Sequence, residues 1–596
     1  MKIAVEGCSH GELDNIYASI LKAEEQGNFK TDVLLLCGDF QALRNVADLE
    51  CLAVPQKYRE LGGFHRYYSG EKVAPLLTIV IGGNHEASNY MWELYHGGWL
   101  APNIYFLGEA GVIDVGGVII AGASGIYKSH DYHRGRYEQM PYDKSSIRSV
   151  YHTRVYDIWR LKLLASSAAS RPDVVLSHDW PNTIEQYGDT AKLISRKPFF
   201  KDEIQSSTLG SPPLLELMRC LRPKYWFSAH LHVKFAAIFE HRQGSGGAHQ
   251  SSGQSGGSSD PDMTLASAGV VSDPSSENPE AIDLDFDDEE DAEQSTKSAG
   301  EDVVKANVNP DELAIDEDEV AGIDEDPPHD HGHGSEAQTA GMSHLDSASP
   351  VGETRFLALS KCLPSQDFLQ FLDIHPRESD DRSNGSTAEA SSSSERTFPP
   401  LRFVPRWLAV LRATNHLLSM TRQQPHLPDP SDAALLERIE QEEVWVRSDL
   451  QSQAGEDSLA IGRIQQFAHT APTASSPLGG QRGPPPWYTN PQTEALTKWL
   501  CIENKINPPP INGPPGPNLG PPIRFGGPSE GVSTPTQPTM TPADEEAEIK
   551  RIEAAAAQAS RARKRFKSDE EKPTEAEPLR LDEDESVDAR WKEGTG

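Results

Sequence analysis

Short apolar runs, each followed at once by a polar loop, recur through the first 242 residues of the chain. Their lengths and their content of Val, Ile, Leu, Phe and Trp are typical of β-strands. The runs are KIAVEG from Lys2, DVLLLCGDF from Asp32, LLTIVIGGN from Leu76, GVIDVGG from Gly111, VIIAGASGI from Val118, DVVLSH from Asp173 and YWFSAH from Tyr225. Helical periodicity lies between several of them, for example from Asp14 to Glu25 and from Ser149 to Ser167. This alternation predicts a layered α/β domain over residues 1–242.

Two further apolar segments flank a long stretch of low complexity. HVKFAAIFE begins at His232 and TRFLALSKCLP begins at Thr354, and apolar and polar residues alternate in both. We predict that they are neighbouring strands of one sheet, with residues 243–352 as a disordered insertion between them. The free-energy cost of closing a loop grows only with the logarithm of its length, so a long insertion is tolerated. An ordinary linker between two domains is the alternative.

The remaining residues divide by composition into three parts. Residues 353–373 are predicted to be a strand and helix that return to the first domain. Residues 398–504 contain patterns such as LLERIEQEEVWVRSDL and predict a small, mainly helical C-terminal region. Residues 505–596 are rich in Pro and Gly and then in charge, which predicts a disordered tail. Its run from Arg561 to Lys567 is typical of a nuclear-localisation patch, although a generic basic cluster has the same composition.

The formal net charge of −35 is unevenly distributed. Residues 1–242 carry about 26 basic and about 27 acidic side chains, a balance typical of a folded domain. Residues 243–352 carry about 2 basic and about 27 acidic side chains. Salt screens exposed charges beyond about 8–10 Å. The acidic tract therefore does not exclude a polyanionic partner for the first domain.

The cysteines and the apolar runs bear on the cellular compartment. The six cysteines are Cys8, Cys37, Cys51, Cys220, Cys362 and Cys501. They lack the short-spaced pairs of a disulfide framework or a zinc knuckle, and apart from Cys8 we expect reduced, mostly buried thiols. We expect no signal peptide, because an apolar strand begins directly after Met1. We also expect no membrane span, because no uncharged apolar stretch reaches the roughly 18–20 residues that a span needs.

Seven candidate metal ligands lie just past the apolar runs. They are Cys8 and His10 in GCSHG, Asp39 in CGDF, Asn84 in GGNHE, His178 in LSHDW, and His230 and His232 in SAHLHV. Strands that end at one edge of a sheet would bring these side chains together. A carboxylate such as Asp39 can bridge two cations, and two metals about 3.5–4 Å apart form a clamp that cleaves phosphate esters. The mixture of N, O and S donors suits Fe, Zn or Mn better than Mg or Ca.

These motifs resemble a known family. GD, GNHE and H-x-H after successive strands are similar to the calcineurin-like metallophosphoesterases, whose pattern opens with D-x-H and closes with G-H-x-H. This chain departs from the pattern at Cys8, where the family usually has Asp, and at Ala229, where it usually has Gly. A thiolate favours softer metals.

Cysteine in the run GCSHGELDNIY resembles one branch of that family, the RNA lariat debranching enzymes. The resemblance extends through GGNHEASNY, SGIYKSHDY, SSIRSVYHTR, LSHDWP, TRFLALSKCLPSQDFLQ and NPQT. It covers residues 1–242 densely, 353–373 well and 398–504 loosely. It leaves the acidic insertion and the tail uncovered.

The resemblance implies a four-layer αββα sandwich that binds two divalent metal ions. It implies Cys8, His10, Asp39 and His232 around one metal, and Asp39, Asn84, His178 and His230 around the other. It also implies that His85 acts as general acid or stabilises the phosphate. The implied reaction is hydrolysis of the 2′-5′ phosphodiester at the branch point of excised intron lariats, with branched RNA as substrate and a linear intron as product. We accordingly expect a role in mRNA processing and intron turnover in the nucleus, with splicing-linked proteins as partners of the acidic insertion or tail.

The segment from Tyr127 to Arg154 interleaves basic and aromatic side chains. Such a mixture suits a phosphate backbone and an unstacked base, although charge runs more often form a solvated surface. The resemblance places recognition of the lariat in this segment. The candidate substrate-binding residues are Tyr127, Lys128, His130, Tyr132, Arg134, Arg136, Arg148, Tyr151, His152 and Arg154.

Two other functions stay open at this point. A metallophosphatase acting on phosphoproteins or small phosphoesters would use the same ligands, but Cys8 and the basic-aromatic segment argue against it. A non-catalytic scaffold would need no metal-competent site, and the complete ligand set together with His85 argues against that. A further histidine group, His329, His331 and His333, lies in the acidic stretch, where solvated disorder is favoured over metal binding.

Overall fold

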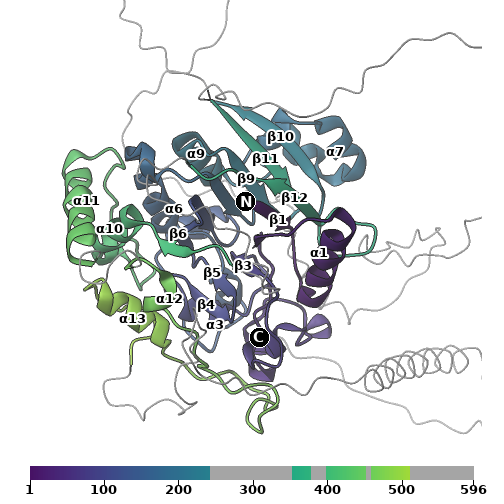
Figure 1. The fold of residues 1–596 in the computed structure, drawn as a ribbon, viewed down its shortest axis with the longest axis horizontal. Helices are drawn as coiled ribbons and strands as arrows, with labels where there is room; N and C mark the ends of the chain where they lie inside the picture. Colours follow the sequence, from purple (N-terminus) through teal and green to yellow (C-terminus); the bar gives the residue numbers. More distant parts are fainter. Residues whose placement is uncertain (242–351, 378–397, 451–457, 510–596) are drawn as a thin grey trace, which may run out of the picture. The chain divides into compact units, whose positions relative to one another are not determined.

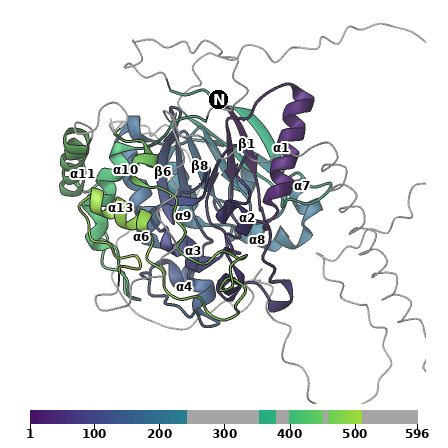
Figure 2. The ribbon, with the colours of Figure 1, turned by 60° about the horizontal axis from the view of Figure 1, so that its bottom comes forward.

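The structure, a computed structural model, describes residues 1–241, 352–377, 398–450 and 458–509. Two β-sheets face each other at its centre, and helices cover their outer faces (Figures 1 and 2). The acidic insertion, its histidine group and the basic run of the tail lie outside the described residues. Within the described ranges, no helix combines the length and the apolar composition that crossing a bilayer requires.

The first sheet is mixed and has β1, β2, β3 and β5 running parallel. Its strand order is β12 (Leu369–Asp373), β1 (Lys2–Glu6), β2 (Val33–Leu36), β3 (Leu77–Val80), β5 (Ile104–Phe106) and β4 (Gly98–Ala101). The edge strands β12 and β4 are antiparallel to their neighbours. The parallel strands therefore end at one edge, where the loops after β1, β2 and β3 meet.

The second sheet has β11, β9, β8 and β7 running parallel. Its strand order is β10 (Phe235–Glu240), β11 (Glu353–Ala358), β9 (Tyr225–Ser228), β8 (Val174–Ser177), β7 (Val118–Ala123), β6 (Ala110–Val115) and β13 (Leu401–Phe403). The strands β10, β6 and β13 are antiparallel to their neighbours.

Alternate residues of the first sheet face two different apolar cores. Val5 and Leu35 belong to the core between the two sheets, whereas Ala4 and Leu34 belong to the core under the helix α1 (Leu13–Gly27). A strand that is buried on both faces needs apolar residues at every position, which explains the uninterrupted runs in the sequence.

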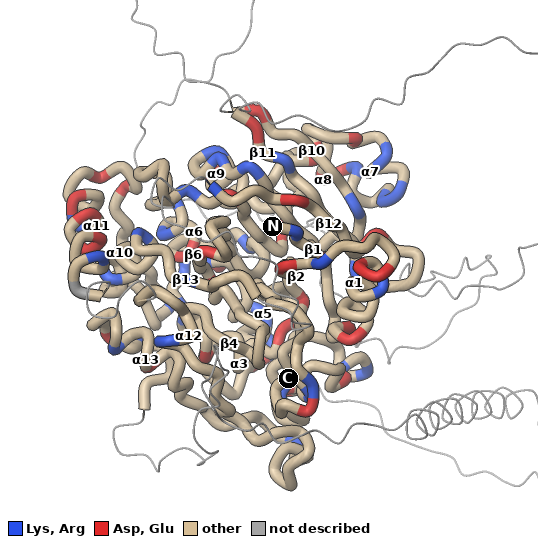
Figure 3. Tube along the Cα trace, viewed as in Figure 1, with Lys and Arg blue, Asp and Glu red and all other residues tan. Residues whose placement is uncertain are grey.

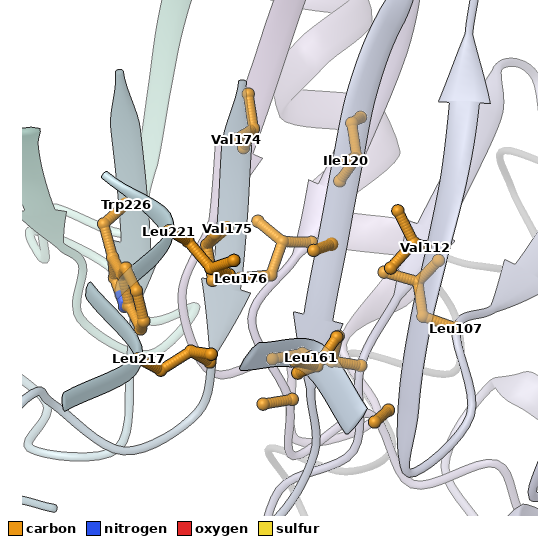
Figure 4. Packing of buried hydrophobic residues seen from close by; sticks show 14 of the residues in the cluster. Leu107, Val112, Ile120, Leu161, Val174, Val175, Leu176, Leu217, Leu221 and Trp226 are labelled. Atoms are coloured by element: carbon orange, nitrogen blue, oxygen red, sulfur yellow. The ribbon is translucent and has the colours of Figure 1, made fainter. Parts of the chain in front are cut away.

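Helices also cover the outer face of the second sheet. Charged residues are frequent along outer helices such as α11 (Figure 3). The covering helices are α6 (Val155–Lys162) and α9 (Pro212–Leu221). Leu161 of α6 and Leu217 and Leu221 of α9 lie over β7 and β8 (Figure 4). The order of layers is helix, sheet, sheet, helix, so the predicted α/β sandwich is confirmed.

The two alternating segments on either side of the acidic insertion are paired strands. β10 and β11 are antiparallel, with Phe235 opposite Ala358 and Glu240 opposite Glu353. The predicted pairing of these two segments is therefore confirmed. The continuation of the second segment differs from the prediction, because residues 369–373 form β12 rather than a helix. Backbone pairing with β1 determines this outcome, and Phe371 of β12 adds to the apolar core under α1.

Removal of the insertion should leave the fold intact, because its two ends are adjacent. His241 donates a backbone hydrogen bond to Gly352, directly beyond the last strand pair. We expect that replacing residues 243–351 with a four-residue turn changes the unfolding temperature by less than about 3 °C. Thermal unfolding of both chains followed by circular dichroism measures the change. Loss of the folded signal on deletion would contradict the paired-strand interpretation.

The C-terminal region is mainly helical but does not form a separate body. Its elements are β13, α10 (Pro405–Thr414), α11 (Ala433–Trp445), α12 (Ile461–Ile464) and α13 (Pro491–Trp499). β13 extends the second sheet beside β6, and α10 packs beside α6 on the outer face of that sheet, where its apolar residues join the large apolar cluster. Gln465 and Gln492 hydrogen-bond to the backbone at Gly97 and Trp99. The region therefore completes the sandwich.

A buried ion pair joins the same region to the first sheet. Arg44 is fully buried and bonds Asp48 and Glu93 at 2.8 Å, and Thr470 donates to the second oxygen of Glu93 at 2.6 Å. We expect Arg44→Met to lower the free energy of unfolding by about 3–5 kcal/mol, because it leaves two buried carboxylates without their cation. Chemical denaturation measures the loss, with exposed Arg438→Met as the control.

The predicted helix from Ser149 to Ser167 is interrupted. α5 (Ser146–Ser149) ends early, and α6 begins only at Val155. Between them, Thr153 donates a backbone hydrogen bond to Ile126, beside a β-bridge between Ile126 and His152. This tertiary pairing takes the backbone groups that a continuous helix would use.

Candidate metal centre

The predicted ligands follow the carboxyl ends of five strands. Cys8 and His10 follow β1, Asp39 follows β2, Asn84 and His85 follow β3, His178 follows β8, and His230 and His232 follow β9. Because the ligand-bearing strands of each sheet are parallel, these loops share one edge of the sandwich.

One group of four side chains offers ligand atoms that all lie within 4.8 Å of one another: Cys8, His10, Asp39 and His232. The Nε2 atom of His10 lies 3.6 Å from Asp39 Oδ2 and 3.3 Å from Nε2 of His232. The structure brings together the whole set that the resemblance implies for one metal.

The second predicted set meets at the other oxygen of Asp39. His178 Nε2 lies 3.3 Å from Asp39 Oδ1 and 3.1 Å from Asn84 Oδ1. The ring centres of His178 and His230 are 5.0 Å apart. Asp39 thus presents Oδ2 to one group of ligands and Oδ1 to the other, which is the arrangement of a bridging carboxylate.

The protonation of these groups suits cations. Burial lowers the pKa of His10 to about 4, that of His230 to about 3 and that of His232 to about 2, so their rings are neutral near pH 7. Burial alone would raise the pKa of Asp39, but the neighbouring histidines, His178 foremost with His85 and His10, together outweigh burial and hold that pKa well below its usual range. Neutral imidazoles converging on an ionised carboxylate are the donor set of Zn, Fe or Mn sites. The residues fit two divalent metals.

A hydrogen bond outside the ligand set orients His178. Its Nδ1 atom lies 2.7 Å from the carbonyl oxygen of Cys37. Donation from Nδ1 to this carbonyl leaves the lone pair of Nε2 directed at Asp39 and Asn84. The second metal position therefore has a ligand whose ring is already fixed.

The backbone at four of the ligands is in the left-handed region. The φ angles are 41° at His10, 50° at Asp39, 63° at His230 and 49° at His232. Such conformations cost about 1–3 kcal/mol each in residues other than glycine and occur where function requires a particular side-chain direction. A Cβ at Gly83 would lie 2.2 Å from Asp39 Oδ1, so glycine is required where the loop after β3 passes the carboxylate.

Cys8 is completely buried, and its Sγ accepts a hydrogen bond from the backbone N–H of His230 at 3.1 Å. Burial, with Asp39 and Glu6 nearby, raises the pKa of the Cys8 thiol well above its usual value. A coordinated dication converts such a thiol to a thiolate. The Cys8 thiol is therefore protonated without a metal and becomes a soft thiolate ligand when a metal binds.

We expect Cys8→Asp to raise the ratio of bound Mn to bound Zn by about tenfold, because a carboxylate is a harder ligand than a thiolate. Metal analysis of protein reconstituted with equal concentrations of both metals measures this ratio. Cys501→Asp, which changes an exposed thiol, is the control. An unchanged ratio in the Cys8 variant would remove this thiol from the metal position.

His85 lies beside the two ligand groups. Its ring centre is 5.5 Å from that of His10, and its Nε2 lies 3.1 Å from Asn84 Nδ2. Its backbone N–H donates to Asp39 Oδ1 at 2.9 Å. Nδ1 of His85 is buried and has no hydrogen-bond partner among the described residues. The imidazole is thus available to a group bound between the metals.

Glu86 is a supporting residue that the sequence analysis missed. Its carboxylate accepts backbone hydrogen bonds from Phe40 at 2.8 Å, Gln41 at 2.9 Å and Gly83 at 3.0 Å. It therefore ties the loop after β2 to the loop after β3. Its position could have indicated this role, because an acidic residue directly after the GNH motif cannot serve as an apolar core residue.

The predicted substrate-binding segment divides into buried and surface residues. Five of its members are buried: Tyr132, Arg136, Tyr151, His152 and Arg154. Arg136 bonds Glu109 and Asp157 at 2.7 and 2.8 Å, and Arg154 bonds Glu138 at 2.5 Å. His152 bonds Asp131 at 2.7 Å. In this structure these charged groups fix the segment in place instead of facing RNA, because buried cations require carboxylate partners.

The other members of the segment reach the surface. They are Tyr127, Lys128, His130, Arg134 and Arg148. The backbone N–H of Tyr127 donates to Asp179, the residue after His178. The segment therefore begins beside the second ligand group and carries partly exposed cationic and aromatic side chains.

Comparison with known proteins agrees with this geometry. Residues 1–234 match the calcineurin-like phosphoesterase family, and residues 351–505 match the lariat debranching enzyme C-terminal domain. The chain is 39% identical to a lariat debranching enzyme of Schizosaccharomyces pombe over 519 residues, covering 86% of this chain and 99% of the relative. It is 37% identical to one of Drosophila pseudoobscura pseudoobscura over 554 residues, covering 91% and 84%. A human lariat debranching enzyme is 56% identical over 242 residues, covering 41% and 44%. With these matches spanning both the sandwich and the region that completes it, the chain belongs to the lariat debranching enzyme family.

Proposed function

We propose that this protein is a metal-dependent phosphodiesterase that hydrolyses the 2′-5′ linkage at the branch point of lariat RNA and releases a linear RNA. The observation that carries the proposal is the position of Asp39, whose two oxygens face two separate groups of ligands. Two cations held in this way would polarise the scissile phosphate and lower the pKa of a bound water.

The residues of the chain then have separate tasks. Asp39 holds the two metal positions at a fixed separation, and His178 and Asn84 fix the ligand atoms around one of them. His85 can protonate the departing 2′-oxygen or stabilise its charge. Cys8, Asp39, Asn84 and His178 are buried, whereas His10, His230 and His232 are partly exposed, so the site is closed on the protein side and open to substrate along its histidines.

We propose Fe, Zn or Mn as the metals, because imidazole and thiolate ligands predominate over oxygen ligands. The Cys8 thiol supports the softer members of this group at the first position. We further propose that the enzyme acts in the nucleus, in mRNA processing and intron turnover, on the basis of the basic run at 561–567. A fusion lacking that run should lose nuclear fluorescence.

The decisive assay compares a synthetic 2′-5′ branched RNA with its 3′-5′ linear isomer, with metal content measured on the same sample. We expect cleavage of the branched RNA alone, by protein containing about two metals per chain. Turnover of p-nitrophenyl phosphate without cleavage of branched RNA would instead indicate a phosphatase. Protein without stoichiometric metal and without turnover would indicate a scaffold.

A further inference from the structure

A charged groove outside the ligand set lies between α7 (Thr190–Arg196) and the beginning of β10. Its volume is about 370 Å³. Lys192, Arg196 and Lys234 supply its cations. Leu193 is buried beneath them, so the groove has an apolar floor and charged walls.

The acidic residues of the groove are already engaged. Asp189 caps α7 by accepting a hydrogen bond from the backbone N–H of Lys192 at 3.0 Å, and Asp367 lies 3.5 Å from the ammonium group of Lys234. Lys192 and Arg196 are exposed, and neither has an ion pair with a carboxylate in the part of the chain that the structure describes. Lys192 and Arg196 therefore bring two cations without a carboxylate partner among the described residues to a groove that also holds Asp189 and Asp367.

Two lysines on this side of the sandwich lie close along the backbone to predicted ligands. Lys234 follows the predicted ligand His232 by two residues, and Lys361 forms a β-bridge with Cys8. Cationic side chains thus lead from the metal centre along the β10 side of the sandwich, and Figure 3 shows basic residues along α7.

The strand order places this surface opposite the basic-aromatic segment. That segment follows β7, whereas the groove lies beside β10, and β8 and β9 with their ligands lie between β7 and the β11–β10 pair. A branched RNA has three strands that diverge from one nucleotide. A protein that holds the branch at the metals needs anion-binding surfaces on more than one side of them.

We propose that the groove between α7 and β10 binds the phosphate backbone of one arm of the branched RNA, on the side of the metal centre opposite the Tyr127–Arg154 segment. This inference rests on the proposed function and names a further part of its substrate site. Lys192 and Arg196 have the i, i+4 spacing that places both cations on one face of α7. Single-stranded RNA suits this surface because its flexible backbone can bring phosphates to both cations.

The test compares two synthetic substrates, a branched RNA with arms of ten nucleotides and a minimal branched trinucleotide. Lys192→Ser/Arg196→Ser removes the two unpaired cations, and Lys192→Arg/Arg196→Lys retains them. We expect the KM of the long-armed RNA to rise about tenfold in the serine variant and to stay near the wild-type value in the charge-retaining variant. The slope of log affinity against log salt should fall in magnitude by about 1.4, the value for two phosphate contacts on a single strand.

The outcomes are distinguishable. Arg438→Ser/Lys498→Ser removes two exposed cations from α11 and α13 and should change neither quantity. Equal KM values for the wild type and the serine variant on long-armed RNA would overturn the groove assignment while leaving debranching itself intact. An equal rise in KM on the trinucleotide would also overturn it, because the effect would then lie at the branch. Failure of the wild type to cleave either substrate would overturn the proposed function instead.

Discussion

Replacement of Asp39 by asparagine should abolish both metal binding and turnover. The variant keeps the shape of the side chain but removes the single negative charge that both ligand groups share. Without it, two dications would face mainly neutral imidazoles in a buried site. We expect the metal content to fall from about two per chain to below about 0.2, and kcat/KM to fall by at least about a thousandfold. Metal analysis and cleavage of branched RNA measure these two quantities.

Loss of the fold would produce the same result, so the variant needs a matched control. Asp114→Asn changes a partly exposed carboxylate near the end of β6, which accepts a hydrogen bond from the backbone N–H of Gly117, and should retain both metals. Thermal unfolding of the two apo-proteins, prepared with a chelator, should give similar midpoints. Two tightly bound metals in a folded Asp39→Asn chain would exclude the bridging role.

His85→Ala should reduce turnover while leaving the metals bound. The contact of His85 with Asp39 is made by its backbone N–H, which alanine retains. Its side chain is absent from the group of ligand atoms around Cys8 and Asp39. We expect kcat to fall by about 10²–10⁴-fold with little change in KM for branched RNA, the range typical of a lost general acid.

A change of leaving group tests the chemical role of His85. A phosphodiester with a p-nitrophenolate leaving group needs no protonation, so the difference between wild type and His85→Ala should shrink on it to below about tenfold. His416→Ala, an exposed histidine on the C-terminal region, is the matched control. A wild-type rate for His85→Ala on branched RNA would remove this side chain from the mechanism.

The C-terminal region acts on the metal centre through the sandwich. The buried Arg44 lies between Glu93 and Asp48, and Thr470 completes the hydrogen bonds of Glu93. Arg44 is close in sequence to Asp39, at the end of the loop that carries the carboxylate. Arg44 also donates to Thr470 Oγ1 at 2.8 Å, so a segment 426 residues away in the sequence anchors this loop.

The sequence alone predicted the strands that carry the candidate ligands and the candidate ligands themselves, but not β4, β5, β12 or β13. Each ligand follows an apolar run, and such runs are local signals that need no partner to be recognised. It also predicted the pairing of β10 with β11, because two alternating apolar segments on either side of a low-complexity stretch can form neighbouring strands of one sheet. The distances between ligands followed from parallel strands that end together.

Only the tertiary structure decided which polar residues face solvent and which are fixed inside. Arg136 and Arg154 have the same local pattern as Arg134 and Arg148, yet Glu109, Asp157 and Glu138 bury the first two. Those partners come from distant positions in the chain, so a local pattern contains no record of them. The interrupted helix before α6 and the strand β12 have the same cause. In both segments, backbone hydrogen bonds to distant parts of the chain outweigh the local preference for a helix, because buried backbone groups need hydrogen-bond partners.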